Sequence, residues 1–268
     1  MRGRKLWMRI LAAALAFGMI LLVLLLTLSF TGDPVSALLA QRAAEQYIQQ
    51  DALRSMGFTL SKAAYNFKFG EYLVRAQSDQ NQDLHFNLYC KNGKVIRDTY
   101  QFDVLENGNV ISRFQGEYQT LLQIQMEQAG LGRILLFVEV SEPRDSDIWV
   151  PGMPFDPDLP VEKSLHLYPD LEEKTLESAA DYLQQVNRFL QEKGYAFSYL
   201  SFFDTDDAHT VMIDHIPTEQ VGQEDFLAYL KQVQQQNQEE EKEEVLAEDT
   251  KQQGEKEEGN FNPTVWVE

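Results

Sequence analysis

The chain has 268 residues, with 42 acidic and 23 basic side chains and a formal net charge of −19 at neutral pH. A surface of that sign repels nucleic acid, anionic lipid headgroups and anionic wall polymers, which excludes them as general partners of the protein. The single cysteine excludes an intrachain disulfide and a Cys-x-x-Cys site.

The N-terminal segment carries the clearest signal. Residues 10–30 contain no charged side chain, and a helix of that length spans roughly 31 Å, close to the hydrocarbon core of a bilayer. Residues 1–9 are basic, with Arg2, Arg4, Lys5 and Arg9. Basic flanks stay in the cytoplasm. We therefore expect a cytoplasmic stub at 1–9, a transmembrane helix at 10–30 and the remainder outside the cytoplasm.

A cleaved signal peptide is the alternative for this segment. Signal peptides usually have an apolar region of about 7–15 residues that ends in an Ala-x-Ala-like site. Residues 10–30 form a longer run, and Ser29-Phe30-Thr31 is a poor cleavage site, so the uncleaved anchor is favoured. An exposed domain without disulfides is also typical of the envelope of a Gram-positive bacterium.

Residues 33–130 are predicted to form a first α+β domain, arranged as helix, antiparallel meander and helix. Asp33-Pro34 is typical of a helix start, and Gly57 of a helix end. The strand-like segments are 58–68, 72–78, 84–90 and 94–97, and Asn92-Gly93 predicts a hairpin turn between the last two. A short helical stretch at 100–105 precedes a long helix that Asn109 can cap. Its apolar face comprises Val110, Phe114, Tyr118, Leu121 and Met126.

Residues 131–236 are predicted to form a second α+β domain in the order β, β, α, β, β, α. Its first strand, 134–140, is almost continuously apolar, which predicts burial on both faces. The other expected elements are a strand at 164–168, a helix from 176 to Gly194, a hairpin at 196–216 and a helix at 223–235. The fold class is therefore α+β, with a single N-terminal transmembrane helix followed by two small helix-on-antiparallel-sheet units.

Two segments are expected to be irregular. The loop from Glu142 to Lys163 holds five prolines, and we interpret its Trp149 and Phe155 as pinning it to its own domain, with a partner site as the alternative. Residues 237–268 form an acidic tail that is predicted to be disordered. Its apolar end, 261–267, is interpreted as inert rather than as a linear motif.

Several stretches of the first domain form a specific pattern. They are Gly32-Asp33-Pro34-Val35, residues 65–72, Asp83, His85-Phe86, Asp98, Tyr100, Asn109, Arg113 and Tyr118. In this pattern the chain resembles the YfjL-like proteins, an uncharacterised family of membrane-anchored proteins of Gram-positive bacteria. The resemblance covers roughly residues 32–120, although the family's threonine after the asparagine is replaced here by Val110. It implies architecture and membrane location, and it brings no activity.

Common catalytic motifs such as Gly-x-Ser-x-Gly, His-Glu-x-x-His and Ser-x-x-Lys are absent from the sequence. One acidic cluster has a composition that could bind calcium: Asp204, Asp206, Asp207, His209, Asp214 and His215. A calcium loop that began at Asp204 would need glycine and glutamate where His209 and His215 stand. We interpret the cluster as a solvated hairpin tip, and we predict no metal, cofactor or catalytic residue.

The remaining candidates are interpreted as structural. Strand alternation places Tyr65, Phe67 and Phe69 on one face, and we expect that face to be sheet core rather than a peptide or glycan site. Cys90 is expected in the core, and His85 is expected to form a surface pair with Asp83.

The leading functional hypothesis is a non-catalytic envelope interaction module that binds a protein or peptide partner at the outer membrane face. The rival hypothesis is an envelope hydrolase with a non-standard site near residues 204–215. A pocket lined by converging acids and histidines would favour the rival, whereas a flat surface would favour the module.

Overall fold

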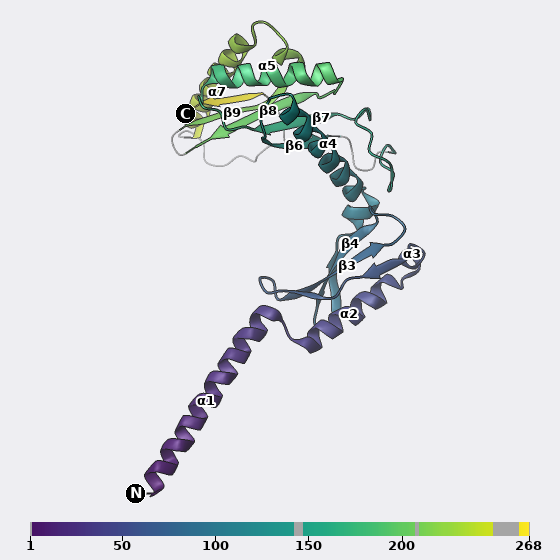
Figure 1. Ribbon diagram of the computed structural model, residues 1–268, viewed down its shortest axis with the longest axis vertical. Helices are drawn as coiled ribbons and strands as arrows, with labels where there is room; N and C mark the ends of the chain where they lie inside the picture. Colours follow the sequence, from purple (N-terminus) through teal and green to yellow (C-terminus); the bar gives the residue numbers. More distant parts are fainter. Residues whose placement is uncertain (1, 142–146, 207–208, 249–262, 268) are drawn as a thin grey trace. The chain divides into compact units, whose positions relative to one another are not determined.

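The computed structural model describes residues 2–141, 147–206, 209–248 and 263–267, which fold into two compact units (Figure 1). Unit 1 comprises Met1–Val110 and Asp147–Met153, and unit 2 comprises Ile111–Ser146 and Pro154–Glu268. The α+β class is confirmed for both units.

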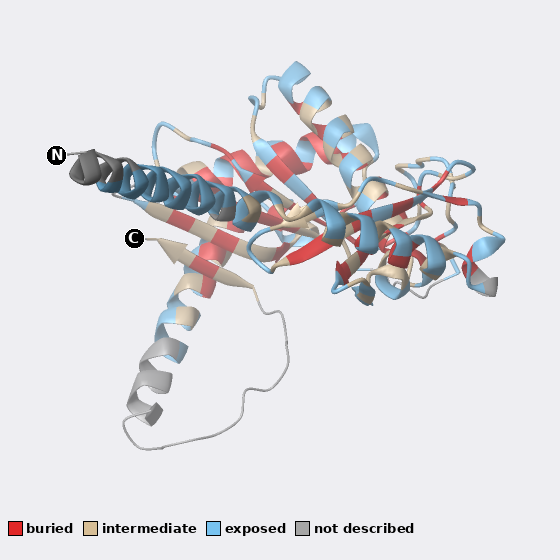
Figure 2. Ribbon diagram, turned by 90° about the horizontal axis from the view of Figure 1, so that it is seen from below, coloured by how far each residue is buried: buried red, intermediate tan, exposed pale blue. Residues whose placement is uncertain are grey.

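Unit 1 begins with the long helix α1 (Arg2–Thr31), the one helix of the described residues that is long and apolar enough to cross a membrane. Its described side chains are exposed except for Leu28, which is of intermediate burial, and Figure 2 shows the helix largely in pale blue. Helix α2 (Pro34–Ile48) follows, and the Asp33 side chain caps it by accepting a hydrogen bond from the Ser36 nitrogen at 2.8 Å. This confirms the expected helix start at Asp33-Pro34.

The sheet of unit 1 has the order β1-β3-β4-β5, with β2 also paired to β3, and every described pair is antiparallel. Its strands are β1 (Phe58–Leu60), β2 (Ala64–Asn66), β3 (Glu71–Ser78), β4 (His85–Lys91) and β5 (Lys94–Asp98). The short helix α3 (Asp51–Arg54) precedes the strands, and a π-helical turn η1 (Gln101–Leu105) follows them. Helix α2 packs Ala40 and Ala44 against sheet residues such as Phe86, Leu88 and Cys90.

The predicted hairpin is present, since Asn92 and Gly93 both have positive φ angles, of 52° and 70°. The single strand expected over residues 58–68 is instead the two short strands β1 and β2. Both pair with β3, because the chain between them bends so that the Ser61 hydroxyl accepts from the Arg75 nitrogen at 2.9 Å.

Unit 2 contains a five-stranded sheet in the order β10-β9-β8-β7-β6. Its strands are β6 (Leu135–Val140), β7 (Lys163–Tyr168), β8 (Tyr199–Thr205), β9 (Thr210–Pro217) and β10 (Thr264–Val267). Its helices are α4 (Gly108–Gln128, assigned to this unit from Ile111), α5 (Leu176–Lys193), α6 (Thr218–Val221) and α7 (Phe226–Glu248). Helices α5 and α7 cover one face of the sheet (Figure 1).

One pair in this sheet is parallel. Strands β7 and β8 run in the same direction because α5 connects them as a crossover, whereas a tight hairpin would have reversed the chain. The expectation of purely antiparallel units is therefore corrected for this pair.

Two further expectations differ from the structure. The division between the units falls at Val110 rather than at residue 130, because Phe114 and Tyr118 of α4 pack against Phe155 and other aromatic rings of unit 2. The tail is also not wholly irregular. Helix α7 continues to Glu248, and β10 pairs antiparallel with β9. Residues 249–262 and 268 lie outside the described residues.

Candidate functional site

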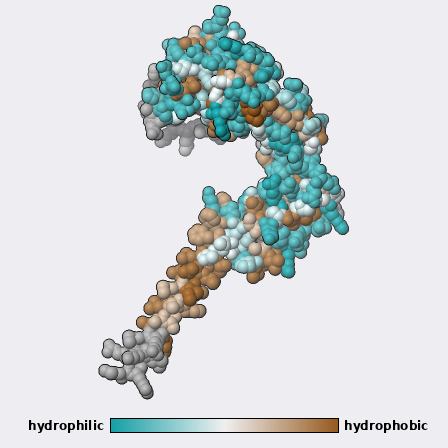
Figure 3. Space-filling model, viewed as in Figure 1, coloured by the Kyte–Doolittle hydropathy of each residue, from teal (hydrophilic) through white to brown (hydrophobic). Residues whose placement is uncertain are grey.

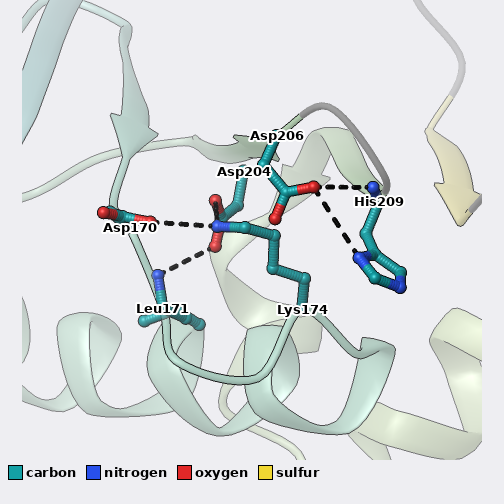
Figure 4. Close-up of polar contacts among 6 residues, drawn as sticks. All are labelled: Asp170, Leu171, Lys174, Asp204, Asp206 and His209. Carbon is teal, nitrogen blue, oxygen red and sulfur yellow. Dashed lines mark hydrogen bonds and ion pairs between the residues drawn. The ribbon is translucent and has the colours of Figure 1, made fainter.

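The acidic side chains around residues 204–215 make hydrogen bonds and ion pairs with other residues of unit 2 (Figure 4). Asp204, at 3% exposure, ends the buried part of β8 and accepts hydrogen bonds from the Leu171 nitrogen, at 3.0 Å, and from the Lys174 ammonium. Lys174 also donates to Asp170 at 3.1 Å. The hydrogen bond with Asp204 raises the pKa of the Lys174 amine. These contacts attach the chain between β7 and α5 to β8, so we assign Asp204 and Lys174 a structural role.

The other members of the cluster point to different neighbours. Asp206 accepts from the His209 nitrogen at 2.8 Å and closes the turn between β8 and β9. Asp214 accepts from the Ser201 hydroxyl at 2.6 Å, while His215 stacks on the Tyr199 ring with centroids 3.8 Å apart. Across the described residues, no three His, Cys, Asp or Glu side chains are placed to hold a metal ion, and Asp207 lies outside that range.

The aromatic stretch of unit 1 is not sheet core throughout. Tyr65 is half-buried and packs on Tyr72, with ring centroids 5.0 Å apart. The expected burial of Phe67 and Phe69 is wrong, because these rings are 62% and 58% exposed. Strand β2 ends at Asn66, whose side-chain oxygen accepts from the Lys68 nitrogen at 3.2 Å, so both phenylalanines lie on a turn.

The remaining sequence candidates are placed as follows. Cys90 is buried as predicted, and burial raises the pKa of its thiol. Asp83 is only 2% exposed, so the expected surface pair with His85 is wrong; its carboxylate accepts from the Gly152 nitrogen instead. Within the long loop, Trp149 is buried in unit 1 and Phe155 packs in unit 2, while residues 142–146 lie outside the described part.

The candidate site is the sheet face of unit 2 that α5 and α7 leave uncovered, which we call the open face. Strand alternation sends Leu136, Leu165, Leu200 and Phe202 to the covered face, where each is fully buried. On the opposite face of these three strands, Ser164 and Ser201 are buried, and the larger side chains are only partly buried or exposed: Leu135, Phe137, His166, Tyr168 and Phe203.

These open-face rings form a continuous row. Phe137 meets Tyr168 edge-on with centroids 5.6 Å apart, and Tyr168 stacks on Phe203 at 5.1 Å. Leu135, Phe137 and Tyr168 are 51%, 45% and 37% exposed. The predicted burial of β6 on both faces is therefore wrong. A continuous apolar run does not distinguish a central strand from an edge strand with one exposed face.

Strand β6 adds a second property to this site, because it is an edge. Among the described strands it pairs with β7 alone, so one side of its backbone presents N–H and C=O groups to further pairing. At this edge the Glu139 carboxylate, 65% exposed, lies 3.1 Å from the His166 Nε2 atom. An exposed edge beside a row of aromatic rings is suited to an added strand with alternating apolar side chains.

Two surface hollows of unit 2 have a different lining. A hollow of about 350 Å³ near Gln184, Asn187 and Gln191 contains one acidic residue, Glu224. A neighbouring hollow of about 200 Å³ contains Glu219 beside Tyr195 and Thr218. Neither hollow brings an acid and a histidine together, so neither favours the hydrolase hypothesis.

Comparison with known families gives two matches. The family described as "YfjL-like, N-terminal domain" matches residues 7–99, and the "YfjL-like C-terminal domain" matches residues 136–247. Neither description names an activity. No curated protein and no solved structure matches the chain.

Proposed function

This chain belongs to the YfjL-like family, and we propose that it is a single-pass membrane-anchored protein whose folded units lie outside the cytoplasm and bind an extended polypeptide. The membrane part of this proposal is supported by α1 and by the basic residues at its start. The binding part is supported by the open face.

The open face is the single observation that carries the binding proposal. An aromatic row beside a strand edge without a described partner provides the two kinds of contact by which a sheet binds an added strand, namely backbone hydrogen bonds and side-chain packing. The β6 backbone supplies hydrogen bonds, and Phe137, Tyr168 and Phe203 supply contact for alternate side chains of the bound segment. The occupant is therefore an extended segment with apolar or aromatic side chains at every second position.

The test of binding is a selection of random peptides on the full chain held in lipid nanodiscs. Selected peptides should lose at least about tenfold in affinity when the chain carries Phe137→Ser or Tyr168→Ser, since tenfold corresponds to about 1.4 kcal/mol and truncating a central hot-spot residue costs about 2 kcal/mol or more. Ile124→Ser removes a comparably exposed apolar side chain, 52% exposed on α4, and should leave binding unchanged.

Backbone pairing needs its own control. Peptides that are N-methylated at alternate residues lose half of their donors while they keep their side chains. One methylation register should abolish binding and the other should leave it nearly intact. Peptides that bind equally well to the Phe137→Ser chain, or tolerate both registers, would refute strand addition at β6.

Topology is tested on intact protoplasts of cells that express the chain with a tag at each end. Added protease should remove the C-terminal tag and spare the N-terminal one. Protection of the C-terminal tag would reverse the proposed orientation. A soluble mature protein that begins near Gly32 would support the signal-peptide alternative instead.

A further inference from the structure

Two turns of unit 1 lie at the same end of its sheet. One turn, residues 67–70, leads into β3, and the other, residues 91–94, leaves β4. The antiparallel register pairs Tyr72 with Cys90, so the start of β3 lies beside the end of β4. The two turns are close in space as well, since a Cβ atom on Gly70 would lie 4.0 Å from the Lys91 ammonium. We call the two turns, together with the first turns of α2, the foot of unit 1.

The foot is attached directly to the end of α1. Gly32 has a φ angle of +72°, and a Cβ there would overlap the Tyr65 ring at 2.7 Å, so only glycine lets the chain pass this close. The Tyr72 hydroxyl donates to the Asp33 carbonyl at 2.8 Å. Phe67 on the first turn packs against Phe30 of α1 with centroids 5.6 Å apart. The foot therefore lies beside the residues at which α1 ends.

Exposed apolar side chains gather on this foot. Phe67 and Phe69 are 62% and 58% exposed, and three residues at the start of α2 are similarly uncovered: Val35, Leu38 and Leu39. In Figure 3 the hydrophobic surface of α1 continues onto the adjoining part of unit 1. Exposed Phe and Leu side chains that lie next to lysines are typical of segments that bind the membrane–water interface.

The same foot carries basic side chains in an otherwise acidic protein. Lys68, Lys91 and Lys94 are all exposed on the two turns. Two of these ammonium groups lie close to Phe69: that of Lys91 donates to the Phe69 carbonyl at 3.4 Å, and that of Lys68 lies 5.5 Å from the Phe69 ring. A surface hollow of about 340 Å³ opens beside Lys91, between Ser29, Ser36 and Tyr65. Lysines above an apolar surface place their charge at the level of lipid phosphates.

We propose that the foot of unit 1 rests on the outer leaflet of the bilayer that α1 spans, with Phe67 and Phe69 inserted at the interface and the three lysines on anionic lipid headgroups. The inference rests on the proposed membrane anchor and goes beyond it, because an anchor alone would leave unit 1 free of the lipid. The general repulsion between this acidic chain and anionic lipid does not apply to the foot, where basic side chains occupy both turns.

The test uses the full chain with its three native tryptophans replaced by phenylalanine and one tryptophan introduced. Phe67→Trp and Phe69→Trp report on the foot. Phe102→Trp reports on a ring of comparable exposure, 50%, which lies on η1 beyond the opposite end of β5. The proteins are placed in vesicles of phosphatidylcholine with one quarter phosphatidylglycerol, with or without bromine on the acyl chains. Flotation of each sample reports separately on membrane anchoring.

Bromolipid should quench the tryptophans at 67 and 69 by about half and leave the tryptophan at 102 nearly unquenched, because quenching by bromine requires near contact with the acyl chains. Lys68→Gln with Lys94→Gln should weaken quenching at position 67 in the anionic vesicles, whereas Lys193→Gln in unit 2 should not. In vesicles of phosphatidylcholine alone, the double lysine substitution should change the quenching at position 67 less than it does in the anionic vesicles.

Each outcome decides the proposal. Chains that float with the vesicles but show equal quenching at 67 and 102 would overturn contact of the foot and leave the anchor intact. Chains that do not float would overturn both. Unchanged quenching after the double lysine substitution would refute the headgroup contact.

Discussion

The carboxylate of Asp83 accepts a hydrogen bond from the backbone nitrogen of Gly152 at 2.6 Å, across 69 positions of sequence. Asp83 is almost fully buried, and its own carbonyl oxygen accepts from the Asn109 amide at 2.8 Å. Gly152 has a φ angle of +83°. This contact links the segment Asp147–Met153 to the rest of unit 1, to which it belongs although it is distant in the chain.

The first prediction removes this contact. Asp83→Ala should lower the free energy of unfolding by about 2–3 kcal/mol, because it leaves a backbone donor without its charged acceptor. Asp79→Ala, four residues earlier and exposed, is the matched control and should change stability by less than about 0.5 kcal/mol. Urea titration followed by far-UV circular dichroism measures both. If Asp83→Ala changed the free energy of unfolding as little as Asp79→Ala does, the Asp83 contact would contribute little to stability.

The second prediction concerns β10. Val265 is 1% exposed and lies opposite Ile213 in the register, and its backbone nitrogen donates a hydrogen bond to the Asn237 side-chain oxygen at 3.0 Å. Val265→Ala should therefore destabilise unit 2 by about 1–2 kcal/mol. Thr264→Ala, on the neighbouring and less buried position, should have a smaller effect. Thermal melts of the full chain measure both effects. If the C-terminal strand contributed nothing to stability, both variants would melt at the temperature of the unsubstituted chain.

The sequence predicts local features of this fold well. The Asp33 cap, the Asn92-Gly93 turn and the Gly194 helix end, with its φ angle of +77°, each depend on a few adjacent residues, and all three are present. These features follow from backbone geometry that neighbours in the chain determine.

Features that depend on distant partners are not predicted. Thr264–Val267 is too short to be recognised as a strand without β9, which completes its hydrogen bonds. The open face is missed for a related reason, since an apolar run such as Leu135–Val140 reads the same whether one or both of its faces are covered. Phe67 and Phe69 show the converse case, where alternation continues from a strand into a turn.

The third prediction concerns the Lys174–Asp204 ion pair. Both side chains are nearly buried, at 9% and 3% exposure, so Lys174→Met leaves the Asp204 carboxylate without its cation and should lower the melting temperature by several degrees. Lys193→Met, on an exposed lysine at the end of α5, is the control.

Calcium should give the chain no larger thermal shift than sodium at matched ionic strength. A large calcium-specific shift that is lost with Asp206→Asn would contradict the interpretation of this hairpin as a solvated tip without metal.

The last prediction is a pH dependence centred on Lys163. This residue is 2% exposed, and its ammonium donates to the Leu159 carbonyl at 3.0 Å and lies 5.7 Å from the Tyr118 ring. Burial lowers the pKa of Lys163, and the attraction of Asp158 and Asp156 opposes that effect without cancelling it.

The sign of the effect follows from proton binding. Between the lowered pKa of Lys163 in the folded state and about 10.4 in the unfolded state, the unfolded chain binds more protons, so the free energy of unfolding rises with pH. One such group contributes at most about 1.4 kcal/mol per pH unit. Lys163→Met removes this contribution. The stability of the unsubstituted chain relative to Lys163→Met should therefore increase as the pH is raised from 7 to 9.5.

Urea titrations of both chains at several pH values measure this difference. Tyr118, whose pKa burial raises, is present in both chains, so its contribution largely cancels in the comparison, and the upper limit of 9.5 also lies below the usual tyrosine pKa. Lys193→Met, which removes an exposed lysine, should run parallel to the unsubstituted chain at every pH. A relative stability of the Lys163→Met chain that stays constant or rises with pH would show that burial does not lower the pKa of Lys163.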